Sequence, residues 1–324
     1  MSVRIVVTGP TLAEEAMAVL HERGAKAIFA PPYTGPADLA ALVAREGADA
    51  ILVRMGEVDA AVIAASANLK AISKHGVGYN NIDVAAATAR KIPVMIARAA
   101  NARSVAELVM ADMYVLVKRL FALDAGLRAG KWEKPGFNGV ELTGKCLGIV
   151  GLGSIGREIA TLAAPLRMRV LAFDPPVPKD AVPAGVTLVD RLEDMLGEVD
   201  VLSLNCPLND QTRNMIGAAE LAKMKPTAFL INAARGGVAD EAALVDALRR
   251  GVIAGAGLDS FTAEPPAADN PLWSLPNVIV TPHIAGVTRE ASARVGIQAV
   301  RNILTVLDGG KPDPACVVNP GVLA

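Results

Sequence analysis

The sequence contains few histidines, few cysteines and few aromatic residues. Among 324 residues there are 3 histidines, 3 cysteines and 3% aromatic side chains. Cys146, Cys206 and Cys316 lie far apart, without the spacing of metal ligands. We therefore expect free thiols in a reducing, cytoplasmic compartment and no metal site.

An excess of one charge and a long apolar run are also absent. The 32 basic side chains balance 33 acidic ones, which disfavours nucleic acid as a partner. No stretch approaches the roughly 18 apolar residues that a spanning helix needs; the best candidate, Val105 to Val117, carries Glu107 and Asp112. The first residues lack a charged region followed by an apolar core, so we expect neither a membrane partner nor a signal peptide.

The first hundred residues alternate short apolar runs with amphipathic segments. Such alternation is typical of βαβ units, whose parallel sheet is covered by helices on both faces. The predicted strands are Arg4–Thr8, Ala25–Ala30, Ala50–Val53, Leu69–Ser73 and Pro93–Ala97, and the predicted helices are Leu12–Arg23, Ala37–Glu46, Ala60–Ala65 and Val84–Arg90.

A second alternation follows, as expected for about two domains in a chain of this length. One long helix, Asn101–Leu120, and a polar stretch, Gly126–Gly144, precede it. The predicted strands are Cys146–Val150, Arg169–Phe173, Val199–Leu204, Ala228–Asn232, Ala254–Leu258 and Val278–Thr281, with a helix at Ser154–Leu166. The position of a final helix, Arg289–Leu307, suggests that the chain returns to the first domain.

A glycine-rich loop joins an apolar strand to a helix at residues 151–156. Gly151, Gly153 and Gly156 have the G-x-G-x-x-G spacing of dinucleotide-binding loops, in which the helix N-terminus receives the diphosphate. The residues between them, Ser154 and Ile155, open the helix. Asp174, at the end of the next strand, is placed to accept hydrogen bonds from ribose hydroxyls, which favours NAD over NADP. Arg157 has the charge to weaken that preference, but we favour the interpretation that it is an arginine on the helix face.

Three polar residues stand near the ends of later predicted strands. Arg235, Glu264 and His283 are the residue types needed to bind a carboxylate, orient a proton donor and transfer the proton during reduction of a 2-keto acid. Ligands of parallel sheets bind beyond the carboxyl ends of the strands, so the three residues are expected to line one cleft. Each alone has a structural alternative: a surface arginine, a turn acid and a capping histidine.

Motifs spread over most of the chain resemble the D-isomer-specific 2-hydroxyacid dehydrogenases, in the branch of phosphoglycerate dehydrogenase and hydroxypyruvate reductase. In chain order they include Asn101-Ala-Arg-Ser-Val-Ala-Glu, the Gly151 loop with Asp174-Pro, Cys206-Pro-Leu-Asn, Asn232-Ala-Ala-Arg-Gly-Gly, Gly257-Leu-Asp, Glu264-Pro and Pro282-His-Ile-Ala-Gly.

The resemblance implies an NAD-dependent oxidoreductase with three catalytic residues. Arg235 would bind the substrate carboxylate and His283 would be the acid or base, while Glu264 would pair with His283 and keep it protonated. Asp259 would hold the nicotinamide carboxamide. The other implied cofactor contacts are Ser104, Cys206, Pro207, Thr212, Ala233 and Gly286.

The resemblance also implies the architecture, an α/β fold with two doubly wound parallel-sheet domains. A flavodoxin-like catalytic domain would comprise residues 1–98 plus 289–324, and a Rossmann NAD-binding domain residues 99–288. Family members are usually homodimers, and the stretch Gly126–Gly144 would contribute to the interface.

Two loops of the first domain would bind the substrate. Backbone amides of Gly76, Val77 and Gly78 would hold the carboxylate, and Arg54 and Met55 would contact the remainder of the molecule. Arg54 has the charge to meet a second anionic group, and Lys74 and His75 either add charge there or cap a strand. His21 is expected at a solvated helix end.

The substrate itself stays open between 3-phosphoglycerate and hydroxypyruvate or glyoxylate. Met55 stands where related phosphoglycerate dehydrogenases tend to have Ser or Thr, and the sequence leaves no room for an added regulatory domain. From a different class, an NAD-binding sensor or scaffold resembling the co-repressors of this family would bind nucleotide with little turnover. Retention of all three catalytic residue types argues against that alternative.

Overall fold

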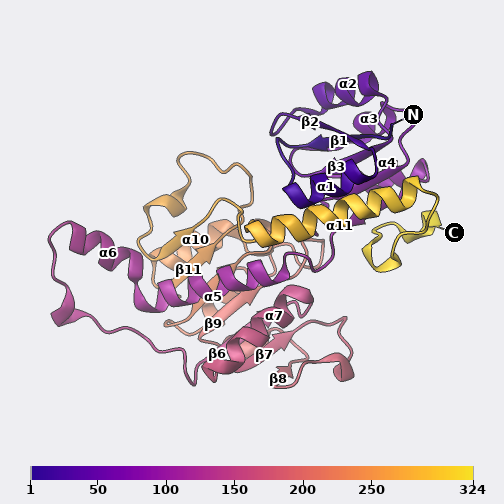
Figure 1. Ribbon diagram of the computed structural model, residues 1–324. Helices are drawn as coiled ribbons and strands as arrows, with labels where there is room; N and C mark the ends of the chain where they lie inside the picture. Colours follow the sequence, from indigo (N-terminus) through magenta and orange to yellow (C-terminus); the bar gives the residue numbers. More distant parts are fainter. Residues whose placement is uncertain (1, 324) are drawn as a thin grey trace. The chain divides into compact units, whose positions relative to one another are not determined.

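The computed structural model describes residues 2–323, which divide into two compact units (Figure 1). Unit 1 comprises Met1–Asn101 and Gly286–Ala324, and unit 2 comprises Ala102–Ala285. Each unit holds one sheet whose strands are all parallel, so the expected α/β class with two doubly wound sheets is confirmed. The assignment of a substrate to one unit and NAD to the other stays a prediction.

The sheet of unit 1 has the strand order β2-β1-β3-β4-β5, which is the flavodoxin-like order. Its strands are β1 (Arg4–Thr8), β2 (Lys26–Ala30), β3 (Ala50–Val53), β4 (Ala71–Lys74) and β5 (Val94–Ile96), and its helices are α1 (Glu14–Glu22), α2 (Pro36–Glu46), α3 (Ala60–Ala64), α4 (Val84–Ala89) and α11 (Arg289–Leu307).

Alternate residues of each strand of unit 1 point to opposite faces of the sheet. Val6 and Ile51 face a core built with α2, α3 and α4, whereas Ile5 and Leu52 face a second core with α1 and α11. All four side chains are fully buried, which explains why the strands are apolar without interruption.

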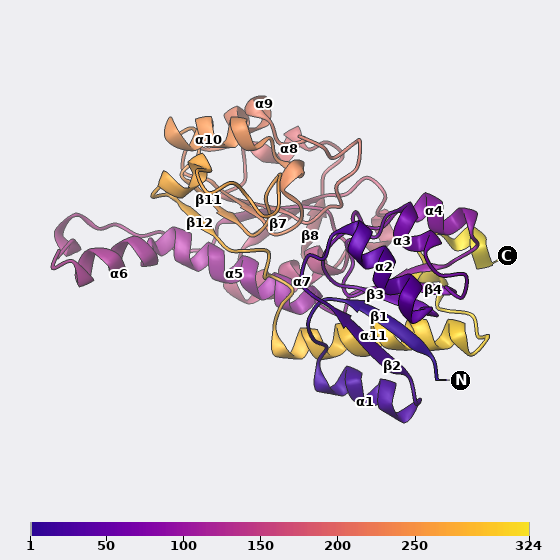
Figure 2. The ribbon, with the colours of Figure 1, turned by 90° about the horizontal axis from the view of Figure 1, so that it is seen from above.

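Helix α11 completes unit 1 from the far end of the sequence. It lies beside α1 on one face of the sheet and buries Ala299, Val300 and Ile303 there (Figure 2). The side chain of Thr288 begins the helix by accepting a hydrogen bond from the amide of Ala291, 3.1 Å away. The predicted helix is present, and it packs within unit 1.

The sheet of unit 2 has the order β12-β11-β10-β9-β6-β7-β8, the Rossmann order with one more strand. Its strands are β6 (Cys146–Val150), β7 (Arg169–Phe173), β8 (Val186–Leu188), β9 (Val201–Leu204), β10 (Phe229–Asn232), β11 (Gly255–Leu258) and β12 (Val278–Val280). Its helices are α5 (Ala102–Lys118), α6 (Leu120–Arg128), α7 (Ser154–Ala163), α8 (Glu193–Leu196), α9 (Ala218–Lys223) and α10 (Glu241–Arg249).

Two cores cover the two faces of this sheet. Helices α5 and α7 pack on one face around Ile149 and Ile231, and helices α8, α9 and α10 pack on the other around Leu202 and Leu230. Figure 2 shows these two helical layers on either side of the strands of unit 2. The sheet edge formed by the carboxyl ends of the strands is left to loops.

The segment after α5 differs from the prediction. The expected single helix to Leu120 ends at Lys118, because Arg119 adopts a left-handed conformation with φ 52°, and α6 then continues to Arg128. Helix α6 buries none of its residues within the chain. The expected polar stretch Gly126–Gly144 is therefore partly helical at its start, and its remainder forms an extended arm (Figure 1).

Several short elements were not predicted. The sequence patterns predict neither strand β8 nor helices α8, α9 and α10. Strand β8 has only three residues and helix α8 only four. Within residues 2–323, no helix combines the length and apolar character needed to cross a membrane.

Candidate active site

The glycine loop of unit 2 brings backbone against backbone. A Cβ atom on Gly156 would lie 2.2 Å from the carbonyl oxygen of Gly151, and one on Gly151 would lie 2.8 Å from the amide nitrogen of Cys206. By contrast, a Cβ on Gly153 would have no atom within 4 Å. The first and third glycines thus allow close packing, while the second leaves the loop surface open for a ligand.

Helix α7 begins directly at this loop. Its N-cap is Gly153, which has no side chain to accept from the first-turn amides. The N–H groups of Ser154, Ile155 and Gly156 are therefore available to an anion, where the helix dipole also favours negative charge. The loop and the helix start fit the diphosphate of a dinucleotide.

Asp174 lies beside the same loop at the end of β7. Its Oδ2 accepts a hydrogen bond from the amide of Leu152 at 2.6 Å. One carboxylate oxygen therefore holds the side chain in place, and Oδ1 keeps acceptor capacity for a ribose hydroxyl. The arrangement fits the nucleoside part of a dinucleotide as well.

Arg235 follows β10 in a loop pressed against the chain after β11. A Cβ on Gly236 would lie 2.0 Å from the carbonyl carbon of Phe261, which only glycine permits. The side chain of Asn232 further fixes the loop by donating to the carbonyl of Arg235 at 2.9 Å. Burial lowers the pKa of Arg235, while the negative charge of Glu264 acts in the opposite direction.

Glu264 and His283 form a hydrogen-bonded pair. Glu264 Oε2 lies 2.7 Å from His283 Nδ1, and its Oε1 accepts from the amide of Phe261 at 3.0 Å. Burial alone would raise the pKa of Glu264, but the hydrogen bonds from His283 and Phe261 and the charge of Arg235 lower it below its ordinary value. The histidine ring is thereby oriented, and Nε2 is its other proton-carrying atom.

Asp259 holds the segment that carries His283. Its carboxylate is almost fully buried and accepts from the Thr281 hydroxyl at 2.6 Å and from the amides of Ile284 and Ala285 at 2.8 Å each. These donors lie on both sides of His283, which has a positive φ of 53°. The structure therefore gives Asp259 a structural task, and the expected contact with a nicotinamide carboxamide stays a prediction.

The remaining expected cofactor residues lie in several places. Ser104 is buried in α5, Ala233 directly follows β10, Cys206 and Pro207 follow β9, Thr212 lies in the next turn, and Gly286 belongs to unit 1. The Thr212 hydroxyl donates to the carbonyl of Pro207 at 2.6 Å, so it shapes its own turn. Burial raises the pKa of Cys206 to about 11, which keeps this thiol neutral.

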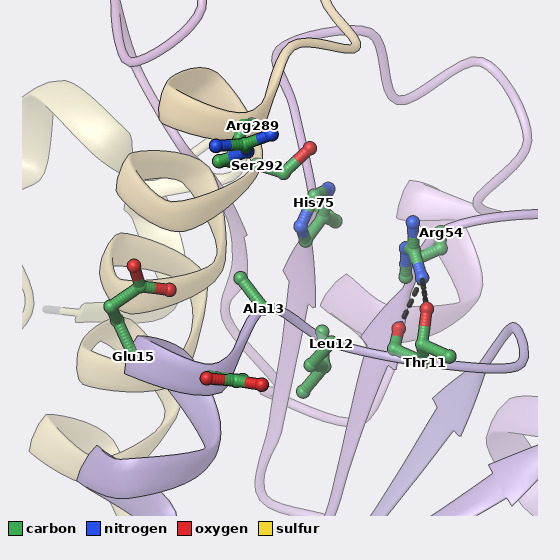
Figure 3. Close-up of a pocket in the computed structure, with 9 residues that line it drawn as sticks. Thr11, Leu12, Ala13, Glu15, Arg54, His75, Arg289 and Ser292 are labelled. Carbon is green, nitrogen blue, oxygen red and sulfur yellow. Dashed lines mark hydrogen bonds between the residues drawn. The ribbon is translucent and has the colours of Figure 1, made fainter.

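Unit 1 contains a cavity of about 450 Å³ at the carboxyl ends of β1, β3 and β4 (Figure 3). Arg54 and His75 line it together with Arg289 and Ser292 of α11. Arg54 donates to the carbonyl of Thr11, which fixes one end of its guanidinium. The cavity lies where the strand order reverses between β1 and β3, the usual ligand position of such sheets.

His75 does not supply positive charge to this cavity at neutral pH. Burial, together with the nearby charges of Arg54 and Lys74, lowers its pKa to about 4. Of the two possibilities raised for Lys74 and His75, this lowered pKa argues against added charge from His75. Lys74 ends β4, where its ammonium donates to the carbonyl of Arg54 at 3.1 Å and to Asn81 Oδ1 at 3.0 Å.

The expected carboxylate loop is only partly free to donate. The amide of Gly76 donates to the carbonyl of Lys74 at 3.0 Å, whereas within residues 2–323 the amides of Val77 and Gly78 have no backbone acceptor. The amide of Met55 likewise donates to the carbonyl of Thr8 at 2.9 Å. A ligand carboxylate would therefore find its donors at Val77 and Gly78.

Sequence reasoning missed three residues near these sites. Arg289 and Ser292 line the cavity of unit 1, and Asp112 lies buried behind Asp259. The first two carry no motif because they sit within an ordinary amphipathic helix. Asp112 does have a signal in the sequence, because it is an acid on the apolar face of the amphipathic helix α5.

Comparison with known proteins identifies the family. The sequence profile of the D-isomer specific 2-hydroxyacid dehydrogenase NAD binding domain matches residues 110–285. The chain belongs to the D-isomer specific 2-hydroxyacid dehydrogenase family. A hydroxypyruvate reductase of Thermotoga maritima, for example, is 42% identical over 80% of this chain and 85% of its own length.

Further proteins are similar in sequence and in fold. A D-3-phosphoglycerate dehydrogenase of Archaeoglobus fulgidus is 44% identical over 81% of this chain but only 50% of its own length, so the chain spans about half of that relative. The crystal structure of the TT0316 protein of Thermus thermophilus superposes with a TM-score of 0.88 and 35% identity, covering 97% of this chain and 99% of that one.

The contact at Gly236 gives a first prediction. We expect Gly236→Ala to lower the free energy of unfolding by at least about 2 kcal/mol, because the added methyl group meets backbone atoms that cannot rotate away. Gly237→Ala is the matched control, since the nearest atoms to its methyl group belong to the side chains of Leu208, at 3.3 Å, and Arg213, at 3.8 Å. Urea unfolding of both variants measures the difference, and equal losses would show that the loop is not held by this contact.

Proposed function

We propose that the protein is an NAD-dependent D-2-hydroxyacid dehydrogenase, which transfers a hydride reversibly between NAD(H) and a small 2-hydroxy or 2-keto acid. The observation that carries the proposal is the arrangement of Arg235, Glu264 and His283 on consecutive loops of one sheet. His283 is fixed through Nδ1 by Glu264 at 2.7 Å, and the charges of Arg235 and Glu264 act on each other. A histidine oriented by a carboxylate beside a buried cation suits proton transfer to a keto acid.

NAD, when bound, supplies or accepts the hydride. The chain holds it through the glycine loop, with the amides of Ser154 and Ile155 toward the diphosphate and Asp174 toward the ribose. The negative charge of Asp174 would repel a 2′-phosphate, so we infer a preference for NAD over NADP. Ser104, Cys206, Pro207, Thr212, Ala233, Asp259 and Gly286 complete the proposed cofactor contacts.

The protein's own side chains provide the proton and the positive charge that binds the substrate carboxylate. His283 gives a proton from Nε2 to the carbonyl oxygen during reduction and takes it back during oxidation. Glu264 keeps its negative charge throughout and stabilises the protonated imidazole. Arg235 provides a planar pair of donors that matches the substrate carboxylate.

The proposed substrate contacts in unit 1 are Arg54, Met55, Lys74, Gly76, Val77 and Gly78. Val77 and Gly78 offer amide donors for the carboxylate, and Arg54 offers a fixed cation for a second anionic group. Relatives named D-3-phosphoglycerate dehydrogenase and hydroxypyruvate reductase support 3-phosphoglycerate or hydroxypyruvate as the substrate. A structural neighbour named glyoxylate reductase supports glyoxylate.

Turnover with keto acids tests the proposed function directly. We expect the purified protein to oxidise NADH with at least one of hydroxypyruvate, glyoxylate, pyruvate and phosphohydroxypyruvate, and to use NADPH less well. His283→Asn should lower kcat by about 10²- to 10⁴-fold, because it removes the proton donor. Absorbance of NADH measures the rate, and calorimetry checks that the variant still binds NADH.

Two outcomes would contradict this proposal. Full turnover in His283→Asn or Arg235→Ala would refute the assigned roles. NADH binding without turnover on any of the acids would favour a nucleotide sensor or scaffold instead.

Arg54 generates a prediction about substrate choice. If its guanidinium binds a phosphate, Arg54→Ala should lower kcat/KM for phosphohydroxypyruvate at least tenfold more than for hydroxypyruvate, because only the first carries the second anion. Arg45→Ala, which removes a 69% exposed side chain of α2, is the matched control. An equal loss on both substrates would remove this role from Arg54.

We also propose a homodimer formed through α6 and the following arm. Phe121, Leu127 and Trp132 are 63%, 58% and 71% exposed, which is unusual for large apolar side chains gathered in one segment. If a second copy of the chain covers these side chains, their exposure within a single chain is explained, as is the absence of any buried residue in α6.

Sedimentation measures this assembly. We expect the parent protein to be a dimer and the double variant Phe121→Asp with Trp132→Asp to be a monomer, since two charges would enter an apolar contact. Tyr33→Asp, which changes a 68% exposed aromatic residue of unit 1, should leave the dimer intact. A parent protein that sediments as a monomer would exclude the proposal.

A further inference from the structure

Asp112 is a buried acid that the proposed mechanism does not use. It lies on the face of α5 that packs on the sheet of unit 2, among Val109, Met113 and Leu116, and only 5% of it is exposed. A carboxyl group in such surroundings is costly unless it is neutral or compensated.

The carboxyl group of Asp112 fits a gap in strand β11. A Cβ on Gly257 would lie 2.9 Å from Asp112 Oδ2 and 3.1 Å from its Cγ. Asp259 follows the last residue of β11, Leu258, and its negative charge reaches Asp112. The glycine thus makes room for the carboxyl group of Asp112 two residues before Asp259 in the chain.

Asp259 is the member of this pair that has hydrogen-bond donors. Its oxygens accept three hydrogen bonds, from Thr281, Ile284 and Ala285, which together hold the segment 281–285 around His283. No described residue forms a comparable hydrogen bond to Asp112. Burial raises the pKa of Asp112 to about 7, and the negative charge of Asp259 contributes to the shift.

Most other charged groups on the elements packed around Asp112 have partners of their own. Strands β10 and β12 carry none. On α5 and α7, Arg103 pairs with Glu107 and Glu158, and Arg157 of α7 donates to the carbonyl of Ala181. On α6, Asp124 pairs with Arg128. The remaining titratable side chains of α5 are Tyr114, which is 41% exposed, and Lys118, the last residue of the helix. The charge that acts on the pKa of Asp112 is that of Asp259.

We propose that Asp112 is a positioning residue for the segment 281–285: protonated, it leaves one negative charge on the Asp112–Asp259 pair, and its ionisation loosens the hold of Asp259 on that segment. Two carboxylates that interact in a buried site repel each other, and this repulsion opposes the position in which Asp259 accepts from its donors. For catalysis the inference rests on the proposed role of His283, but the structural part does not.

The sign of the pH dependence follows from the raised pKa of Asp112. A carboxyl group whose pKa is higher in the folded state than in the unfolded state stabilises the fold fully at low pH, and this contribution is lost as pH rises through about 7. The segment 281–285 should therefore be held more tightly at pH 6 than at pH 8.5.

Hydrogen exchange of the amides of Ile284 and Ala285 tests the proposal without any substrate. After correction for the intrinsic rates, we expect their protection in the parent protein to fall at least tenfold between pH 6 and pH 8.5. Asp112→Asn should abolish the fall, because the amide has the same shape and no charge. Glu107→Gln, an exposed acid on the same helix, is the matched control and should behave as the parent does.

Two further measurements complete the test. Titration of the Asp112 carboxyl carbon by nuclear magnetic resonance in the parent protein needs no variant, and a midpoint at the ordinary value of about 4 would overturn the proposal. So would an identical loss of protection in Asp112→Asn and parent. If the protein reduces keto acids, the fall of kcat at alkaline pH should move to higher pH in Asp112→Asn. If it turns over no keto acid at all, the proposed function is rejected. The hydrogen exchange of Ile284 and Ala285 then still decides whether Asp112 positions the segment 281–285.

Discussion

The parallel order of the sheet in unit 2 is the constraint on which its candidate site depends. Strands β10, β11 and β12 are neighbours and run in the same direction, so the segments that leave them begin at one edge. Arg235, Asp259 and His283 follow these three strands within a few residues of their ends. Arg235 and His283, which lie 48 positions apart in the sequence, are thus brought to the same edge by strand pairing.

Proximity at the edge is then refined by contacts that only certain residues allow. Gly236 lets the Arg235 loop touch the backbone at Phe261, and that same stretch donates its amide to Glu264. Asp259 holds the loop of His283 by accepting hydrogen bonds from the amides of Ile284 and Ala285, one with each carboxylate oxygen. The three candidate catalytic side chains are therefore oriented by backbone contacts, which restrict them more strongly than surface ion pairs would.

Much of this could be predicted from the sequence, because apolar runs and glycine spacing act locally. The strands, α11 and the glycine loop each carry their signal within about twenty residues. The break at Arg119 and the short helices α8 and α9 carry no such signal, since a left-handed arginine or a single helical turn is stabilised by contacts distant in sequence. The pairing of Glu264 with His283 was expected only through the family resemblance.

The effect of burial on charge could not be predicted from residue type. His75, Arg54 and Lys74 are all basic, and the sequence allowed each to attract an anion. In the folded unit, burial and the charges of Arg54 and Lys74 make protonation of His75 unfavourable. Arg54 and Lys74 therefore carry positive charge there, and His75 does not. Asp112 shows the same effect with the opposite sign, because its burial and the negative charge of Asp259 raise its pKa to about 7. In both units the protein thus limits the number of like charges by protonation state, and it retains the charges that have fixed partners: Arg54 on Thr11 and Asp259 on the loop of His283.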